Sequence, residues 1–420
     1  MILSYIKEHP VLRHQKILII TVLTLVAYYI ALNREQAFPW LIASLLLSSL
    51  IASYLFPRLL IRNVSVSRTG PDRAKENEHI FFDIKISNHG IIPRFMIQAI
   101  DKLPFIHSLE GIKSNTQILG VVAYIGSGAT HNFKVSVGCE KRGLYQLGPV
   151  GISTSFPFGL LEAHQNKNGG TQTLTIYPDL FPIIRLPLLG TPSEIHRGAF
   201  LLPKGAGSAE FSGLREYRQG DNPRHIHWPT TARTNELMLK EFEPLASAKL
   251  HIILDQSKVS NVGTGKHASF EYAVRIAASI ARYATNNGMS INVSPYQGKD
   301  SIGLGSGEMH FREIMDYLAI IDANSDVTYS TVIQEVAMSM TEGQTTIVFL
   351  SEPSARVSET LQSLALLKAR GANIIAIHLD RASFMGTHSE SHSLWTGIFD
   401  LDIGYFSIRK DDNLTSAFNS

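Results

Sequence analysis

Residues 345–352 read TTIVFLSE, an apolar run that ends in a serine and a glutamate. An apolar run this short, between polar flanks, predicts a strand that is covered on both faces of its sheet. Residues 249–254 and 374–379 have the same character, and residues 290–294 are also predicted to form a strand. The segments that space their apolar residues as helices do are 270–284, 310–321, 331–340 and 361–369. This alternation predicts an α/β domain over residues 249–420, with a mostly parallel sheet and helices on both faces.

Each predicted strand of this sheet ends at or beside a polar residue. These residues are Asp255, Ser294, Ser351 and Asp380. Ligands of parallel sheets bind at the carboxyl ends of the strands. We therefore expect the functional residues of the α/β domain to lie along this edge.

The segment that precedes the α/β domain has a different period. Apolar and polar residues alternate in 82–87, 133–137 and 174–176, and Gly, Pro and Asn separate these runs. Such alternation is typical of antiparallel strands with one buried face, so we predict a β-sandwich over residues 63–182. Residues 183–248 are less periodic and are interrupted by Pro and Gly, and we interpret them as a linker.

The N-terminal part of the chain is strongly apolar. Its two apolar runs, 17–32 and 37–56, are separated by the charged residues Arg34 and Glu35. The second run is long enough for the hydrocarbon core of a bilayer, about 30 Å thick, and the first spans it together with its flanks. Residues 1–62 therefore predict a membrane anchor of two transmembrane helices. A cleaved signal peptide and a buried helical hairpin of a soluble protein are the alternatives.

The distribution of basic residues predicts the orientation of this anchor. Lys7, Arg13 and Lys16 precede the first run, and Arg58 and Arg62 follow the second. Cytoplasmic flanks of transmembrane helices carry an excess of Lys and Arg. We therefore expect both termini and the soluble domains to lie in the cytoplasm.

The overall composition excludes several classes of protein. The 420 residues include 38 Lys and Arg against 36 Asp and Glu, a net charge of +2, which speaks against a nucleic-acid partner. A hydrophobic fraction of 44% excludes a mainly disordered chain. The single cysteine, Cys139, excludes an intrachain disulfide and a multi-cysteine zinc site, and it fits a reducing compartment.

The most polar segment of the chain is residues 213–243. Its charged residues balance, with Arg215, Arg218, Arg224, Arg233 and Lys240 against Glu216, Asp221, Glu236, Glu241 and Glu243. Equal numbers of guanidinium and carboxylate groups indicate ion pairing, and Tyr217 and Trp228 offer ring faces for arginine. The pattern leaves three interpretations open: an ion-pair network that holds the segment together, a docking surface for a partner, or a catalytic site.

Part of this segment resembles a known family signature. The pattern R-E-Y-R-x-G-D-x-x-R-x-I-x-W-x-x-x-A-R, from Arg215 to Arg233, resembles that of the family called domain of unknown function 58. A second stretch, 142–145 with 156–160, resembles the family's R-G-x-Y and D-P-F-G-L block, although Phe156 stands where many members have Asp. The residues that match the signature, as partner-binding or structural residues, are Arg215, Tyr217, Arg218, Gly220, Asp221, Arg224, His227, Trp228 and Arg233.

The resemblance implies more than the residues alone do. It implies a C-terminal domain similar to a von Willebrand factor A domain, a bacterial-type inner membrane, and partnership with a MoxR-type AAA+ ATPase and other membrane proteins. A von Willebrand factor A domain often holds Mg²⁺ in a metal-ion-dependent adhesion site that begins with D-x-S-x-S. Asp255 and Ser257 match this motif, Val259 replaces its second serine, and Glu352 follows a later strand. We expect a degenerate site at Asp255, Ser257 and Glu352, which either binds Mg²⁺ or serves only packing and protein contact.

These observations support two functional hypotheses. The first is a membrane-anchored interaction module or adaptor, without enzymatic activity, that acts with the ATPase in assembly or maturation of a membrane or envelope complex. The second is a metal-dependent hydrolase that uses Asp255 and Glu352 with a histidine such as His227.

Overall fold

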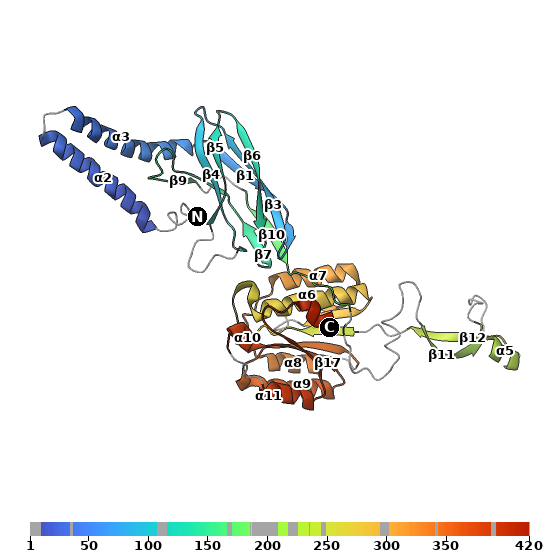
Figure 1. The fold of residues 1–420 in the computed structure, drawn as a ribbon. Helices are drawn as coiled ribbons and strands as arrows, with labels where there is room; N and C mark the ends of the chain where they lie inside the picture. The colour runs from blue at the N-terminus through green and yellow to red at the C-terminus, as the bar shows by residue number, and fades with distance from the viewer. Residues whose placement is uncertain are drawn as a thin grey trace. The chain divides into compact units, whose positions relative to one another are not determined.

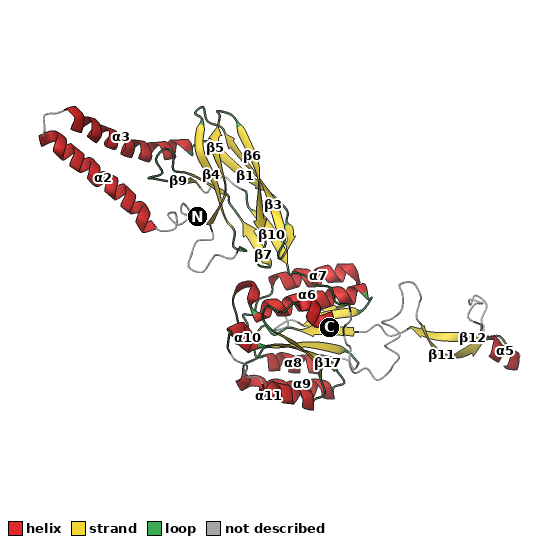
Figure 2. Cartoon of the chain, in the orientation of Figure 1, coloured by secondary structure: helices red, strands yellow, loops and turns green. Residues whose placement is uncertain are grey.

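The computed structural model of the protein describes residues 10–33, 37–106, 116–165, 170–184, 186, 209–216, 226–234, 236–244, 249–294, 302–340, 343–387 and 392–419. The chain forms two compact units, Met1–Asp179 and Leu180–Ser420. Figure 1 shows the first unit with two long helices and a β-rich region, and the second with a sheet between helices. Figure 2 shows the same elements by type.

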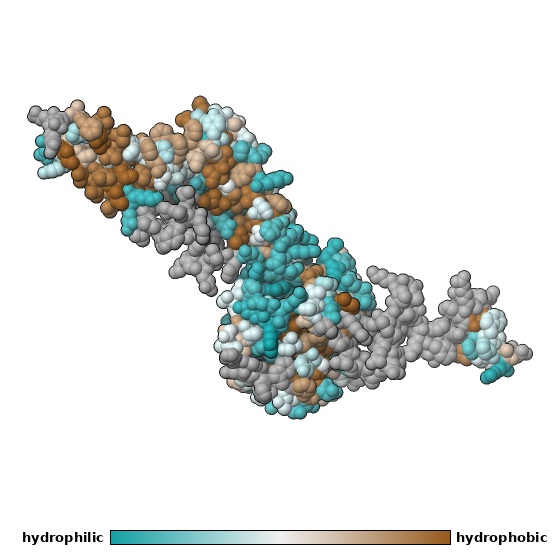
Figure 3. Space-filling view, in the orientation of Figure 1, coloured by the Kyte–Doolittle hydropathy of each residue, from teal (hydrophilic) through white to brown (hydrophobic). Residues whose placement is uncertain are grey.

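The first unit begins with two apolar helices, α2 (Pro10–Asn33) and α3 (Ala37–Leu60). Each has 24 residues, and at 1.5 Å per residue this gives about 36 Å, more than a hydrocarbon core of about 30 Å. Both are long and apolar enough to cross a membrane, as predicted. Figure 3 shows apolar surface along both helices.

The two helices pack through small residues and expose large ones. Thr24 and Ala31 of α2 are buried, as are Ala43 and Ser53 of α3, and Pro57 and Leu60 are buried near the end of α3, whereas most leucines and isoleucines of both helices are exposed. The hydroxyls of Thr24 and Ser53 donate to the carbonyls of Ile20 and Ser49, each at 2.7 Å. Small residues between the helices and apolar side chains on their outer surface are typical of helices packed in a membrane, where the lipid tails are as apolar as leucine. This arrangement disfavours the alternative of a buried hairpin in a soluble protein.

The rest of the first unit consists of ten described strands. They are β1 (Val64–Thr69), β2 (Arg73–Lys75), β3 (His79–Asn88), β4 (Arg94–Lys102), β5 (Thr116–Ile125), β6 (Thr130–Gly138), β7 (Gly143–Leu147), β8 (Gly151–Thr154), β9 (Ala163–Gln165) and β10 (Gln172–Tyr177). They form sheets in the orders β1-β3-β6, β2-β10-β7 and β5-β4-β8-β9. All pairings are antiparallel except that of β2 with β10. The predicted strands at 82–87, 133–137 and 174–176 lie in β3, β6 and β10.

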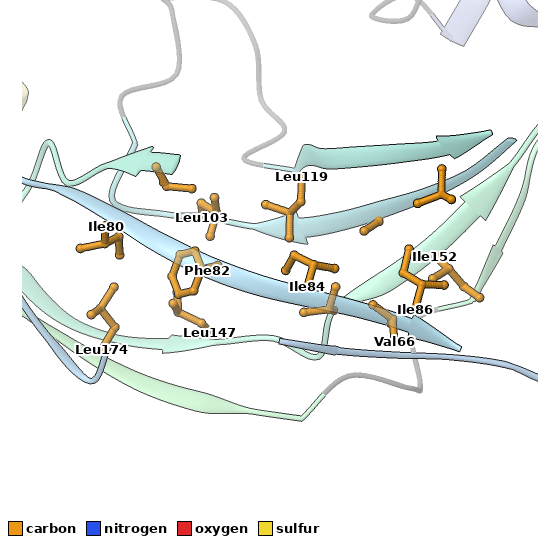
Figure 4. Close-up of a cluster of buried hydrophobic side chains, with 14 of the residues drawn as sticks. Val66, Ile80, Phe82, Ile84, Ile86, Leu103, Leu119, Leu147, Ile152 and Leu174 are labelled. Atoms are coloured by element: carbon orange, nitrogen blue, oxygen red, sulfur yellow. The ribbon is translucent and has the colours of Figure 1, made fainter. Parts of the chain in front are cut away.

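Alternation along β3 explains how these sheets share one core. Ile80, Phe82, Ile84 and Ile86 are buried, and the residues between them are exposed or half-buried. Figure 4 shows these side chains packed against apolar residues from the other strands, including Leu119, Ile152 and Leu174. A side-chain period of two places every second residue on the same face of a strand, which is the pattern that the sequence predicted.

The second unit contains a six-stranded sheet. Its strands are β13 (Lys249–Ile253), β14 (Ser290–Ser294), β15 (Ile302–Gly305), β16 (Thr345–Leu350), β17 (Asn373–Leu379) and β18 (Gly404–Ile408), in the order β15-β14-β13-β16-β17-β18. All neighbours are parallel except β14 and β15. The predicted parallel sheet is therefore confirmed, whereas β15 and β18 were not predicted.

Helices cover both faces of this sheet, as Figure 1 shows. The helices are α6 (Ser269–Asn286), α7 (Gly307–Ile320), α8 (Tyr329–Ser339), α9 (Val357–Ala369), α10 (Arg381–Met385), α11 (His392–Asp400) and α12 (Leu414–Asn419), with short 3-10 turns η2 (Gly265–His267) and η3 (Ser354–Arg356). The predicted linker contains a further hairpin, β11 (Ala209–Glu216) and β12 (Met238–Pro244), with α5 (Trp228–Thr234) between its strands.

Candidate functional site

The carboxyl ends of three adjacent strands meet at one edge of the α/β sheet. Asp255 follows β13, Ser351 and Glu352 follow β16, and Asp380 follows β17. In the parallel register, Ile253 of β13 pairs with Val348 of β16, and Leu350, the last residue of β16, pairs with His378 of β17. The sheet therefore places these polar residues along one short edge, as the sequence predicted. We call this region the carboxyl edge.

Asp255 lies at the centre of the carboxyl edge. It is buried, and its Oδ1 accepts a hydrogen bond from the backbone N–H of Ser257 at 2.9 Å. A carboxylate that accepts the N–H two residues ahead fixes a tight turn. The backbone beyond the turn is also held, because Lys258 N–H donates to the carbonyl of Ser325 at 3.0 Å. Asp255 is thus positioned by the backbone and has a second carboxylate oxygen at the edge.

Arg381, from α10, joins the loops of the carboxyl edge. Its Nη1 donates to the carbonyls of Val259 at 2.8 Å, Ser260 at 3.2 Å and Ser351 at 3.2 Å. Burial lowers the pKa of Arg381, and the nearby charge of Asp255 opposes this shift. The hydroxyl of Ser351 donates to the same Ser260 carbonyl at 2.9 Å. The loop after β13 is therefore clamped to the end of β16.

A small cleft opens between these loops. It encloses about 10 Å³, and it is lined by Asp255, Ser260, Asn261, Ser269, Phe270, Ala273, Phe349, Ser351 and Leu379. The Ser260 hydroxyl is buried and has no hydrogen-bond partner among the residues that the structure describes. The cleft is therefore lined by the Asp255 carboxylate and by a serine hydroxyl that can bind a further group.

Glu352 has a different environment from Asp255. Thr360 donates a hydrogen bond to its Oε2, and its buried Oε1 has no hydrogen-bond partner in the described part of the chain. Burial raises the pKa of Glu352 to about 8, the charge of Asp255 adds to this shift, and Arg356 opposes it. At neutral pH Glu352 is therefore mainly protonated, and its side chain does not line the cleft.

Comparisons with known proteins match part of the chain to a family. Residues 213–382 match the family described as Protein of unknown function DUF58. An uncharacterised protein of Bacillus subtilis strain 168, YeaD, is 30% identical over 114 residues, which are 27% of this chain and 27% of YeaD. The chain thus matches only about a quarter of that curated relative. The family predicted from the signature is confirmed.

Similar solved structures are also found, but each covers only part of the chain. A CARDB domain from Pyrococcus furiosus is 15% identical, with 27% of this chain and 94% of that domain covered and a TM-score of 0.20. A β-glucosidase from Listeria innocua is 9% identical, with 27% and 16% covered and a TM-score of 0.20. A red sea bream transglutaminase is 10% identical, with 27% and 15% covered and a TM-score of 0.19. Likeness at this level supports no conclusion about this chain.

The DUF58 match includes both the signature and the carboxyl edge. Of the signature, Tyr217, Arg218, Gly220, Asp221 and Arg224 lie outside the described residues, and Arg215 lies in β11. His227 precedes α5, where its Nδ1 lies 2.8 Å from the Thr230 hydroxyl. Trp228 exposes 64% of its surface, and Arg233 is also exposed. The described part of the signature is thus a helix that presents an aromatic ring and a guanidinium group to solvent.

The structure gives only part of the donor set expected for Mg²⁺ in the DUF58 domain. Asp255 lines the cleft, but Ser257 bonds Asp255 through its backbone and Glu352 bonds Thr360. Among the described residues no group of three His, Cys, Asp or Glu side chains could hold a metal ion. Hard cations prefer several oxygen ligands, commonly carboxylates. Asp255 and Ser257 thus share one turn and Glu352 is bonded by Thr360, and Mg²⁺ binding by this trio stays a prediction.

Three residues at or near the carboxyl edge were missed by the sequence analysis. Arg381 follows Asp380 directly after a buried strand, and this position could have identified it. Tyr329 is fully buried, donates to the carbonyl of Ile253 at 2.8 Å and accepts from the N–H of Phe349 at 3.0 Å, which joins β13 to β16. His251 of β13 is buried beside the Ser294 hydroxyl, and burial lowers its pKa to about 4. The feature of the sequence that could have identified His251 is a single histidine within a mostly apolar strand.

Proposed function

We propose that this protein is a membrane-anchored interaction module, and that its carboxyl edge and α5, the helix within the family signature, bind a protein partner. As the family resemblance implies, the partner we propose is a MoxR-type AAA+ ATPase, acting in assembly or maturation of a membrane or envelope complex. Helices α2 and α3 would hold the chain in the inner membrane, with both termini cytoplasmic. The second unit would act as a von Willebrand factor A-like domain.

The observation that supports this proposal best is the combination of a fixed edge and a small cleft. Arg381 and Ser351 hold the loops around Asp255, so the edge is preorganised for contact. The space enclosed there is only about 10 Å³, no more than one water molecule needs, so the carboxyl edge does not have the roughly 300–1,000 Å³ of a typical small-molecule site. A rigid edge without such a cavity suits contact with the surface of a protein partner.

The test is retention of a partner by the full chain in mild detergent. We expect the tagged wild-type protein to retain an AAA+ ATPase from its own membranes. Asp255→Asn keeps an oxygen for the Ser257 N–H and removes the charge, so retention should fall strongly. Asp326→Asn is the matched control, because Asp326 is an exposed carboxylate that pairs with Lys258 at 3.0 Å.

Each outcome of this experiment decides the proposal. Equal retention by Asp255→Asn and Asp326→Asn would show that the carboxyl edge is not the binding site. Absence of any retained ATPase or membrane protein would overturn the interaction function. A metal-dependent turnover that is lost in Asp255→Asn, with retention unchanged, would favour the hydrolase instead.

A further inference from the structure

One end of the β-rich region exposes apolar side chains. The loop between β3 and β4, residues 89–93, presents Ile91 with 92% of its surface exposed and Ile92 with 55%. The loop after β8, residues 155–159, presents Phe158 with 56% exposed. Both loops lie at the same end, because the hydroxyl of Thr154 at the end of β8 donates to the carbonyl of Phe95 at the start of β4. We call this end the apolar tip.

The loop that carries the two isoleucines is held by Asn88. The amide Nδ2 of Asn88 donates to the carbonyls of Ile92 and Gly126, each at 2.9 Å. Its Oδ1 accepts from the N–H of Gly90 at 3.0 Å and from Nε of Arg94 at 3.1 Å. Hydrogen bonds therefore fix the conformation of the loop that exposes the two isoleucines.

The same loop is joined to the end of α3. Arg94 Nη1 donates to the carbonyl of Leu59 at 2.8 Å, and its Nη2 donates to that of Arg62 at 2.7 Å. The N–H of His89 donates to the carbonyl of Asn63 at 2.8 Å. A charged guanidinium at the last carbonyls of a helix also stabilises the negative end of its dipole. The apolar tip is thus fixed beside the residues where α3 ends.

This position places the tip at a membrane surface. When α3 spans the bilayer, its C-terminal end lies at the edge of the hydrocarbon core. Ile91 is two residues from His89, which is at most about 7 Å of extended chain. The headgroup layer on each side of the core is roughly 5–8 Å thick. Ile91 and Ile92 are therefore within reach of this layer.

The chemistry of the tip favours lipid over water. The loops 89–93, 126–129 and 155–159 contain no Asp or Glu. The basic residues Arg58 and Arg62 lie at the end of α3, which Arg94 joins to the tip. The tip also has an aromatic cluster, in which Phe95 lies 5.2 Å from Phe156 and 5.5 Å from Tyr124 between ring centroids. Aromatic rings concentrate at membrane interfaces, and basic residues attract anionic headgroups.

We propose that the apolar tip is a membrane-contact surface, and that Ile91, Ile92 and Phe158 insert into the headgroup layer of the bilayer beside α3. This inference rests on the membrane anchor of the proposed function. The contact would give the β-rich region a second attachment to the lipid, in addition to the covalent one through α3, and would fix its orientation on the membrane.

The test measures the depth of single labelled cysteines in lipid vesicles. The full chain is reconstituted into phosphatidylcholine–phosphatidylglycerol vesicles that contain a lipid with a nitroxide near its headgroup, and an environment-sensitive fluorophore is attached at Ile91→Cys. Leu55→Cys labels the exposed face of α3, and Lys141→Cys is the control. Lys141 is exposed at the far end of β6, whose nine residues separate it from the tip by about 27 Å. The native Cys139 is buried and burial raises its pKa to about 12, so it reacts little, and wild type measures this background.

We expect a blue shift and strong quenching for the labels at positions 91 and 55, and neither for position 141. Quenching at position 55 with none at position 91 would overturn the membrane-contact surface and leave the anchor intact. Absence of quenching at position 55 would overturn both the anchor and this inference. A label at position 91 that is unquenched in vesicles but shielded from aqueous iodide in native membranes would assign the tip to a protein partner, and would also overturn the proposal.

Discussion

Glu352 and Asp255 show how two carboxyl groups at one edge have different environments. Asp255 accepts a backbone N–H bond and lines a cleft that opens to solvent. Glu352 is largely buried, and the neighbouring negative charge adds to the effect of burial, so its pKa rises to about 8. Two nearby carboxylates rarely both ionise when one of them is removed from water. The sequence shows two acids after two strands, but not which one is buried.

The raised pKa of Glu352 predicts a pH dependence of stability. Its ordinary pKa is near 4.5, so the folded state holds a proton that the unfolded chain loses as pH rises from about 4.5 to 8. Stability therefore falls over this range. Glu352→Gln keeps an acceptor for Thr360 and cannot ionise, so we expect it to be more stable than wild type at pH 9 by up to a few kcal/mol, at about 1.4 kcal/mol per pKa unit. At pH 5 the difference should nearly vanish.

Thermal unfolding of the full chain in detergent at pH 5 and pH 9 measures this effect. Glu335→Gln is the control, because Glu335 is exposed on α8 and its neutralisation should leave the pH dependence unchanged. An identical loss of stability between pH 5 and pH 9 in wild type and Glu352→Gln would refute the assignment of a proton to Glu352.

Among the helices and strands, the sequence predicted those that are marked by a regular pattern of apolar residues. The strands predicted at 290–294 and 345–350 have the bounds of β14 and β16, and β16, with its run of four apolar residues, is buried at every position. Edge strands lack this constraint. β18 alternates half-buried and exposed residues and β15 contains two glycines, so neither has the apolar run that marks a covered strand. The position of Arg381 after a strand end is visible in the sequence, but the carbonyls that Arg381 and Tyr329 bond are not, since these bonds join segments far apart in the chain.

The packing of α2 against α3 predicts a sharp difference between two neighbouring positions. Ala43 is fully buried between the helices, whereas Ser44 is exposed on the outer surface. Ala43→Leu forces three extra carbon atoms into a contact made by small residues, and overpacking of this kind costs about 1–3 kcal/mol. Ser44→Leu adds similar bulk toward the surroundings and should cost little. Thermal unfolding in detergent compares the two, and equal effects would contradict the packing of this helix pair.

For the whole molecule, the decisive prediction is the side of the membrane on which the second unit lies. Lys7, Arg13 and Lys16 precede the first apolar run, residues 17–32, and Arg58 and Arg62 follow the second, residues 37–56. The loop between the helices has one Arg and one Glu, so the positive-inside rule predicts that both ends lie in the cytoplasm. A fusion of alkaline phosphatase, active only outside the cytoplasm, should be inactive at the C-terminus and active between Arg34 and Glu35. A fluorescent protein that folds in the cytoplasm should give the opposite pattern. Activity of the phosphatase at the C-terminus would place the carboxyl edge outside the cytoplasm, where a cytoplasmic ATPase cannot reach it. Extraction of the chain by carbonate without detergent would show that α2 and α3 do not anchor it in a membrane.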